Sequence, residues 1–128
     1  MRKPCVLIVE DEFIVAFELK AALERLGYRV CGIASSGQAA IDYAERESPD
    51  CVLMDVSLKG EMDGIEAARH IRARGGIRSV FLSGYPTDEM TERVADLRPI
   101  ACFVKPVEYE QLEAALAAFF LSRAARMD

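Results

Sequence analysis

The sequence is poor in the features that mark membrane, disulfide-bonded and nucleic-acid-binding proteins. Its first apolar run, residues 5–9, ends in two acids and is too short for a signal-peptide core or a membrane span. The four cysteines stand singly, without the paired spacing of a zinc site or disulfide framework, so we expect buried free thiols. The net charge of -5 and the lack of a Lys/Arg block argue against nucleic-acid binding. We therefore expect a cytoplasmic protein that binds neither membranes nor nucleic acid and acts through protein contacts.

Short apolar runs alternate with longer segments of helical period, and this alternation predicts an α/β fold with a mostly parallel sheet. The chain has 128 residues, 52% of them hydrophobic, and no internal linker or repeat, so we expect one domain over residues 1–128 and no output domain. Strands are expected over residues 6–9, 28–34, 51–54, 80–82 and 102–104. Helices are expected over residues 12–26, 37–47, 63–74 and 108–123, with a short polar helix between residues 87 and 99 and a tail from residue 123.

Three of these helix ends carry capping signals. Gly27 suits the left-handed position that follows the first helix. Ser35 or Ser36 suits the N-cap of the second helix, and Asp63 suits the N-cap of the third.

Four of the expected strands are followed by residues that a phosphoryl-transfer site needs. Glu10 and Asp11 follow the first strand, and Asp55 follows the third. Ser83 follows the fourth strand, and Lys105 follows the fifth. Because the carboxyl ends of parallel strands open into one crevice at a topological switch point, these side chains are expected to meet there.

The chemistry of such a cluster follows from its groups. Asp55 comes directly after an apolar strand and is the natural nucleophile, whose attack on a phosphoryl group forms an acyl phosphate. Clustered carboxylates repel one another unless a cation is present, so Glu10 and Asp11 predict a Mg²⁺ site. Lys105 and Ser83 suit charge neutralisation and positioning of the transferred group.

Five short blocks, in this order and on a matching strand and helix pattern, resemble the receiver domain of bacterial two-component response regulators. The blocks are residues 9–12, 53–56, 63–64, 82–84 and 104–106. The resemblance implies a stand-alone receiver of flavodoxin-like (βα)5 fold, with strand order 2-1-3-4-5. It also implies that a histidine kinase or histidine phosphotransfer protein phosphorylates Asp55 in the presence of Mg²⁺. Such a domain is not an enzyme acting on other substrates, because it catalyses only its own phosphoryl transfer and dephosphorylation.

The same resemblance implies individual roles around the metal. Asp11 and Asp55 would bind it directly, the backbone carbonyl of Ser57 would complete the protein ligands, and Glu10 would act mainly through water. It further implies a cis peptide bond before Pro106, which aims the preceding lysine inward.

Two departures from the family pattern bear on switching and on the site loop. Most receivers have an aromatic residue three positions before the lysine, but here that residue is Cys102. The stretch 81–86 is similar to the Phe-Ala-Thr-Gly-X-Tyr motif of a receiver subgroup, so Tyr85 either takes over the coupling role or is an ordinary loop residue. The loop after Asp55 is one residue longer than usual, and Gly60 and Gly64 are expected to absorb this by adopting positive φ.

Exposed apolar residues are candidates for partner contacts. Phe13, Ile14 and Phe17 broaden the apolar face of the first helix and suggest an interface, which by resemblance is where kinases and phosphotransfer proteins dock. The alternative is ordinary core packing against the last helix. Phe119 and Phe120 leave core, dimer and output roles open. The downstream partner is not identified by the sequence, and we expect a monomer or weak homodimer.

Three other functions remain to be weighed. A degenerate receiver that binds partners without being phosphorylated is suggested by the missing aromatic at Cys102. An aspartyl-nucleophile phosphatase usually has a second acid two residues after the nucleophile, where this chain has Ser57. A flavin carrier of the same fold is disfavoured, because acids at the switch point repel the FMN phosphate.

Overall fold

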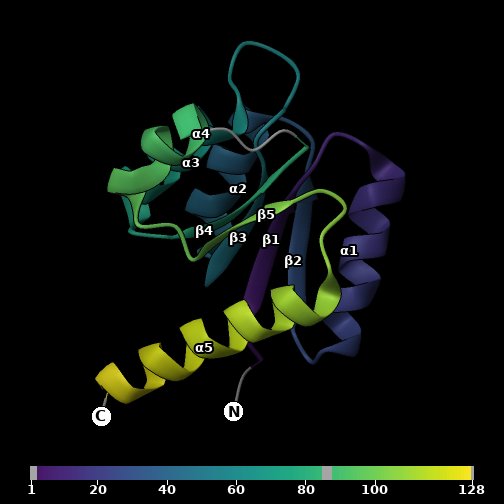
Figure 1. Cartoon of the computed structure of the whole chain (residues 1–128), viewed down its shortest axis with the longest axis vertical. Coiled ribbons are helices and arrows are strands. Elements are labelled where there is room, and N and C mark those ends of the chain that lie inside the picture. The colour runs from purple at the N-terminus through teal and green to yellow at the C-terminus, as the bar shows by residue number, and fades with distance from the viewer. Residues whose placement is uncertain (1–2, 85–87, 128) are drawn as a thin grey trace.

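The structure is a computed structural model that describes residues 3–84 and 88–127, and these form a three-layer α/β fold (Figure 1). The strands are β1 (Cys5–Val9), β2 (Arg29–Ala34), β3 (Cys51–Asp55), β4 (Ser79–Ser83) and β5 (Ala101–Val104). The helices are α1 (Phe13–Arg25), α2 (Gly37–Glu47), α3 (Gly64–Gly75), α4 (Asp88–Val94) and α5 (Tyr109–Met127), with a 3-10 turn η1 (Ala95–Leu97) after α4. No helix in these ranges is both long and apolar enough to cross a membrane.

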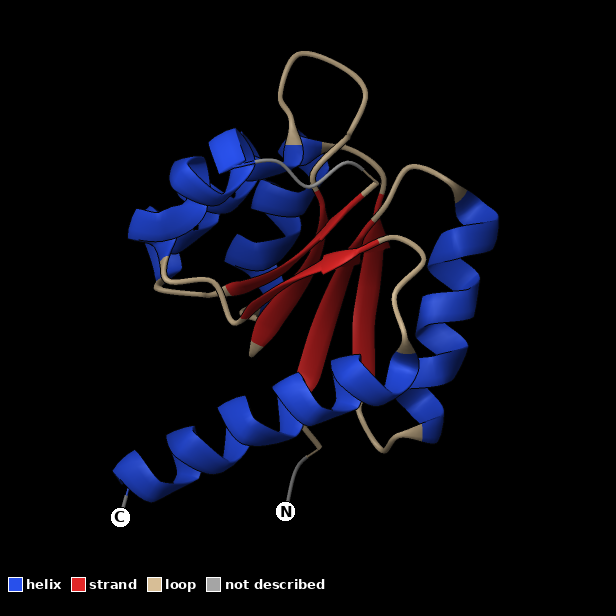
Figure 2. Cartoon of the chain, in the orientation of Figure 1, coloured by secondary structure: helices blue, strands red, loops and turns tan. Residues whose placement is uncertain are grey.

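All neighbouring strands are parallel, in the order β2-β1-β3-β4-β5, which confirms the predicted flavodoxin-like topology. Figure 2 shows the sheet as the central layer between two groups of helices. One core joins α1 and α5 to the sheet through residues such as Val6 and Ile8, and the other joins α2, α3 and α4 through residues such as Leu7 and Val9. Strands β1, β3 and β4 are buried along their whole length, which explains their continuous apolar runs.

The strand order puts the switch point between β1 and β3. The chain leaves β1 toward β2 on one side and later returns to β3 on the other, so a crevice forms where these two strands end. The register aligns Val9 with Met54, Asp55 with Leu82, and Ser83 with Val104. Four strands therefore end at one edge of the sheet, which we call the carboxyl edge.

Local capping explains three of the helix ends. The Ser36 hydroxyl accepts a hydrogen bond from the Ala39 amide, and the Asp63 carboxylate accepts one from the Glu66 amide. Gly27 has φ +96, as expected of a residue that ends a helix in the left-handed region. Helix α1 begins at Phe13, one residue later than predicted, because the residue before it has extended backbone.

Helix α5 corrects the prediction of a tail after residue 123. It continues to Met127, through residues that are mostly good helix formers. Arg123 lies within it, with its guanidinium over the Phe119 ring and 3.5 Å from Asp50 Oδ1, so a contact to the start of β3 holds this part of the helix.

The thiols also differ in part from the expectation. Cys5 and Cys51 are buried as predicted, and Cys31 is half-buried. Cys102 is exposed, which is a correction. It lies on the edge strand β5, where alternate residues face away from the packed core, and Val104 shares its exposure.

Gly60 and Gly64 differ in why they are glycines. Gly60 has φ +107, as predicted for the long loop after β3. Gly64 does not have positive φ, so that part of the prediction is wrong. It is needed for close approach instead, because a Cβ there would overlap the carbonyl oxygen of Asp55. The start of α3 is thereby pressed against the end of β3.

We predict that Gly64→Ala lowers the free energy of unfolding by about 2–3 kcal/mol, since the added methyl group must push backbone apart. Urea unfolding followed by circular dichroism measures this. Gly75→Ala is the matched control, because the added Cβ would meet only the Ile77 side chain at 3.4 Å and alanine favours the helix. Equal losses in the two variants would contradict the close-approach explanation.

Candidate functional site

Three acids from two strands form the centre of the carboxyl edge. Glu10 follows β1 and is 2% exposed, and Asp55 ends β3 and is also 2% exposed. Asp11 is half-buried at the mouth of the cluster. One carboxylate oxygen from each of the three lies within 4.8 Å of the others. The sheet therefore brings together residues 10, 11 and 55, as the sequence predicted.

Backbone amides hold these carboxylates in place. The Glu12 amide donates to Glu10 Oε2 at 3.2 Å, and the Ser57 amide donates to Asp55 Oδ1 at 3.0 Å. Each of these bonds spans two residues and belongs to the turn that follows its strand. One oxygen of each carboxylate is thus oriented by the backbone of the turn that follows its strand.

A third amide comes from the long loop after β3, and sequence reasoning missed it. The Lys59 amide donates to Asp11 Oδ2 at 3.2 Å. Leu58 anchors this loop, because its side chain is only 6% exposed and packs with the α2 and α3 core. The signal in the sequence was Leu58 within a loop that also contains the apolar residues Val56 and Met62.

Lys105 supplies the positive charge of the site. Its Nζ lies 2.9 Å from Glu10 Oε1 and 3.4 Å from Asp55 Oδ2, and its side chain is 23% exposed. The Lys105 amide also donates to the Ser83 carbonyl at 2.8 Å, which ties the end of β5 to the end of β4. The peptide bond between Lys105 and Pro106 is cis.

Burial and pairing set the protonation of these groups. Burial raises the pKa of Glu10, the Lys105 hydrogen bond opposes this rise, and nearby Asp55 adds to it. Burial alone would lower the pKa of Lys105, but its contacts with Glu10 and Asp55 outweigh that effect and raise the pKa. Lys105 therefore stays charged at neutral pH.

The charges of the cluster fit a hard divalent cation. Three carboxylates and one ammonium leave a negative centre, and all of the free ligand atoms are oxygens, which Mg²⁺ prefers. Glu10, Asp11 and Asp55 could contribute to such a site. Each carboxylate has one oxygen held by an amide, so the cluster is preorganised for a ligand on the open side.

The other predicted site residues have fewer described contacts with the acid cluster. Ser83 is 3% exposed and ends β4, next to the strand that carries Asp55. Ser57 is exposed, and only its amide is seen to take part in the cluster. Tyr85 lies outside the described residues, so its suggested coupling role stays a prediction.

An exposed apolar patch borders the acidic cluster at the start of α1. Phe13, Ile14 and Phe17 are 68%, 76% and 58% exposed, and the two phenylalanine rings lie 6.4 Å apart. The alternative of core packing is therefore wrong for these residues. Phe119 and Phe120 instead are half-buried and pack with the α1 and α5 core.

Comparison with known proteins places these features in a family pattern. A family model described as the response regulator receiver domain matches residues 6–117. Transcriptional regulatory protein PdtaR of Mycobacterium tuberculosis is 36% identical over 107 residues, which cover 84% of this chain and 52% of PdtaR. Sporulation initiation phosphotransferase F of Bacillus subtilis is 29% identical over 112 residues, which cover 87% of this chain and 89% of that protein.

A solved structure with a bound magnesium ion resembles the chain in fold. The receiver domain of a sensor histidine kinase from Pseudomonas aeruginosa, solved with a magnesium ion coordinated in its active site cleft, is 30% identical with a TM-score of 0.77. The match covers 90% of this chain and 95% of that domain. The present chain spans about half the length of PdtaR, so it corresponds to one part of that protein.

We predict that Asp11→Asn raises the free energy of unfolding of the metal-free protein by about 1 kcal/mol, since it removes repulsion from two neighbouring carboxylates. The same substitution should reduce the stabilisation that Mg²⁺ gives the wild type. Urea unfolding in EDTA and in Mg²⁺ measures both effects. Glu12→Gln is the control, because that side chain is exposed beside the cluster, and it should change neither value. A destabilised metal-free Asp11→Asn protein would contradict the repulsion argument.

Proposed function

The chain belongs to the response regulator receiver domain family, and from this membership we propose that it is the phospho-accepting switch of a two-component phosphorelay. Asp55 is the proposed phosphoacceptor. The observation that supports this most directly is a nearly buried carboxylate with an ammonium at 3.4 Å and two further acids beside it. An acid that only caps a helix would not need a nearby ammonium group and two further acids.

The proposed step is a transfer between two nucleophiles. A carboxylate oxygen of Asp55 attacks the phosphorus of a phosphohistidine, the phosphorus–nitrogen bond breaks, and the imidazole leaves. Lys105 already lies beside Asp55 and would stabilise the negative charge on the phosphoryl oxygens. The Ser57 amide holds the other oxygen of Asp55 and fixes the direction of attack. Water attack on the acyl phosphate later restores the free carboxylate.

The acid cluster is the proposed Mg²⁺ site, with Glu10, Asp11, Asp55 and the Ser57 carbonyl as the protein groups that would hold the ion. When bound, Mg²⁺ supplies positive charge to the phosphoryl oxygens and offsets the repulsion among the carboxylates. In this proposal the protein catalyses only its own phosphorylation and dephosphorylation.

Switching is proposed to pass through Ser83 and Tyr85. Ser83 ends β4, the strand next to that of Asp55, at the carboxyl edge where the phosphoryl group would be bound. Cys102 takes the position of the usual aromatic, and it is a small exposed side chain on β5, so it cannot fill the space of a ring. Tyr85, two residues after Ser83, is the proposed replacement.

We propose that one protein delivers the phosphoryl group to this domain and that another receives its signal. The α1 patch of Phe13, Ile14 and Phe17 borders the acid cluster, so a histidine kinase or phosphotransfer protein that docks there can present its phosphohistidine to Asp55. We propose that this receiver domain is cytoplasmic, is monomeric or weakly dimeric, and acts on an unidentified downstream protein. The second candidate is a phosphorylation-independent binding module, which the missing aromatic at Cys102 favours.

Acetyl phosphate with Mg²⁺ should add one phosphoryl group to the wild type and none to Asp55→Asn, because Asp55 is the proposed nucleophile. Intact mass spectrometry measures the adduct, and omission of Mg²⁺ should reduce it strongly. Asp42→Asn, which changes an exposed carboxylate on α2, should be labelled like the wild type. If the folded protein takes up no phosphoryl group under any condition, the proposed switch function is wrong and the phosphorylation-independent binding module replaces it.

We predict that replacing both Phe13 and Phe17 with alanine slows transfer from the phosphorylated partner protein at least about tenfold, since exposed aromatic residues often carry binding energy. Labelling by acetyl phosphate and the free energy of unfolding should stay unchanged, because the rings are solvent-exposed and lie outside the site. Leu121→Ala removes an apolar side chain that is 71% exposed on α5 and serves as the control. An equal fall in the rate of labelling by acetyl phosphate would contradict a docking role.

A further inference from the structure

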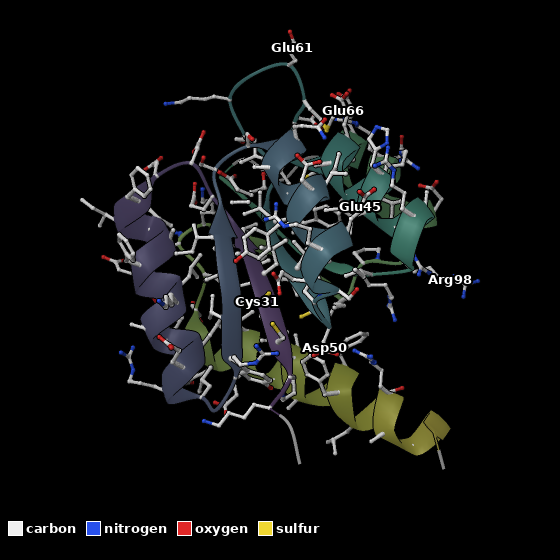
Figure 3. All side chains as sticks on the ribbon, turned by 180° about the vertical axis from the view of Figure 1, so that it is seen from behind. Cys31, Glu45, Asp50, Glu61, Glu66 and Arg98 are labelled. Atoms are coloured by element: carbon white, nitrogen blue, oxygen red, sulfur yellow. The ribbon has the colours of Figure 1, made fainter. Side chains whose placement is uncertain are left out.

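A groove lies at the opposite edge of the sheet from the acid cluster. It has a volume of about 920 Å³ and is formed where α2 and α3 end, where β3, β4 and β5 begin, and where α5 crosses beneath them. Glu45, Asp50 and Arg98, labelled in Figure 3, lie around it. No residue of the acid cluster or of the α1 patch lines this groove, so it is a separate feature of the molecule.

The groove is basic on an acidic protein. Its lining includes five arginines, which are Arg72, Arg74, Arg78, Arg98 and Arg123. Among the described residues only two acids, Glu45 and Asp50, line it with them, so their net charge there is +3 on a chain whose net charge is -5. Such a local reversal of sign attracts anions and steers them to this edge.

Part of this positive charge is not neutralised by the protein. Arg74 pairs with Glu45 at 2.5 Å. Arg72 donates to the Gly76 carbonyl at 2.9 Å but makes no ion pair with any described carboxylate. Arg98 has left-handed backbone with φ +50, and within residues 3–84 and 88–127 its exposed side chain has no ion-pair partner. These two guanidinium groups are available for a ligand.

The lining of the groove also includes apolar side chains and an aromatic ring. The half-buried Ile77 contributes aliphatic surface and the half-buried Phe119 contributes the ring, whereas Ile41 and Ile71 are almost wholly buried. The Arg78 and Arg123 guanidiniums lie 5.3 and 5.5 Å from the centroid of that ring. Guanidinium groups held over an aromatic ring present flat cationic surfaces, which suit a planar group in an anionic ligand.

A buried hydroxyl lies beside the same residues. Ser79 is 4% exposed at the start of β4, and its Oγ has no hydrogen-bond partner among the described residues. It shares a small void with Arg72, Ile77 and Arg78, all of which also line the groove. An unsatisfied buried hydroxyl costs free energy, and the void has no room for a water-sized molecule, so the ligand of the groove is not expected to reach it.

We propose that this groove binds a phosphorylated small molecule of nucleotide size. Guanidinium groups form forked hydrogen bonds with phosphate oxygens, and Arg72 and Arg98 are the groups available to make them. The flat guanidinium groups of Arg78 and Arg123, held over Phe119, suit the ring system of such a ligand. The volume lies within the range of small-molecule sites. A peptide adding as a strand is excluded here, because the groove meets the ends of the strands and not their sides.

The test is a titration of the full ¹⁵N-labelled chain with ATP in EDTA, followed by the positions of the backbone amide signals. We expect saturable shifts at Gly75, Gly76, Ile77 and Arg98, with none at Asp55, because without a metal the acid cluster repels anions. Inorganic pyrophosphate should shift the same amides but bind more weakly than ATP, since it has no ring to stack on the guanidinium groups held over Phe119. Rising salt should weaken both.

Variants separate the groove from general charge effects. The double variant Arg72→Gln with Arg98→Gln should weaken ATP binding at least about tenfold, since two charge-assisted contacts are lost. Arg25→Gln, which removes an exposed charge on α1, should stay within about twofold of the wild type. If the double variant does not give a folded spectrum, Arg98→Gln alone replaces it, because that side chain is exposed and its loss leaves the core intact.

Several results would overturn the proposal. No saturable shift at the groove up to about 5 mM ATP would exclude a binding site of even millimolar affinity. Equal affinities for ATP and pyrophosphate would show that no ring is recognised. An equal loss of ATP affinity in Arg25→Gln would show that the effect comes from the net charge of the protein and not from the groove. Tighter binding of a hexaglutamate peptide than of ATP would identify the groove as a contact for an acidic protein segment.

Discussion

The interaction on which the site depends is the nearly buried contact of Lys105 with Glu10 and Asp55. These residues come from the ends of three strands, and the two hydrogen-bonded partners are 95 positions apart in the sequence. Each charge would be costly to bury alone, so the group is stable only when all of the strands are in register. The parallel order of β1, β3 and β5 across the sheet is therefore a condition for the chemistry as well as for the core.

The acid cluster is held against its own repulsion by the rest of the fold. Backbone amides of residues 12, 57 and 59 each orient one carboxylate, and Leu58 fixes the loop that supplies the last of them. Gly64 lets α3 begin directly against the carbonyl of Asp55. Well-packed elements thus support a locally unfavourable group of charges, as is common at functional sites.

The two edges of the sheet have opposite electrostatic character. The carboxyl edge gathers the acids that follow the strands, whereas the amino edge gathers arginines from α3, α5 and the segments before β4 and β5. Both follow from parallel strands, because all of the strands enter at one edge and leave at the other. A cation is favoured at the first edge and an anion at the second, so two ligands of opposite charge can bind without competing.

The sequence by itself determined the strand and helix order, the caps at Ser36 and Asp63, and the residues that meet at the carboxyl edge. These features are written locally, as apolar runs, capping side chains and the residue that follows each strand. Only the tertiary structure decided how far α5 extends, that Cys102 is exposed, and that the groove is basic. It also decided that Gly64 is needed for space and not for φ. Each of these depends on contacts between segments distant in sequence, and no local pattern records which distant atoms will be neighbours.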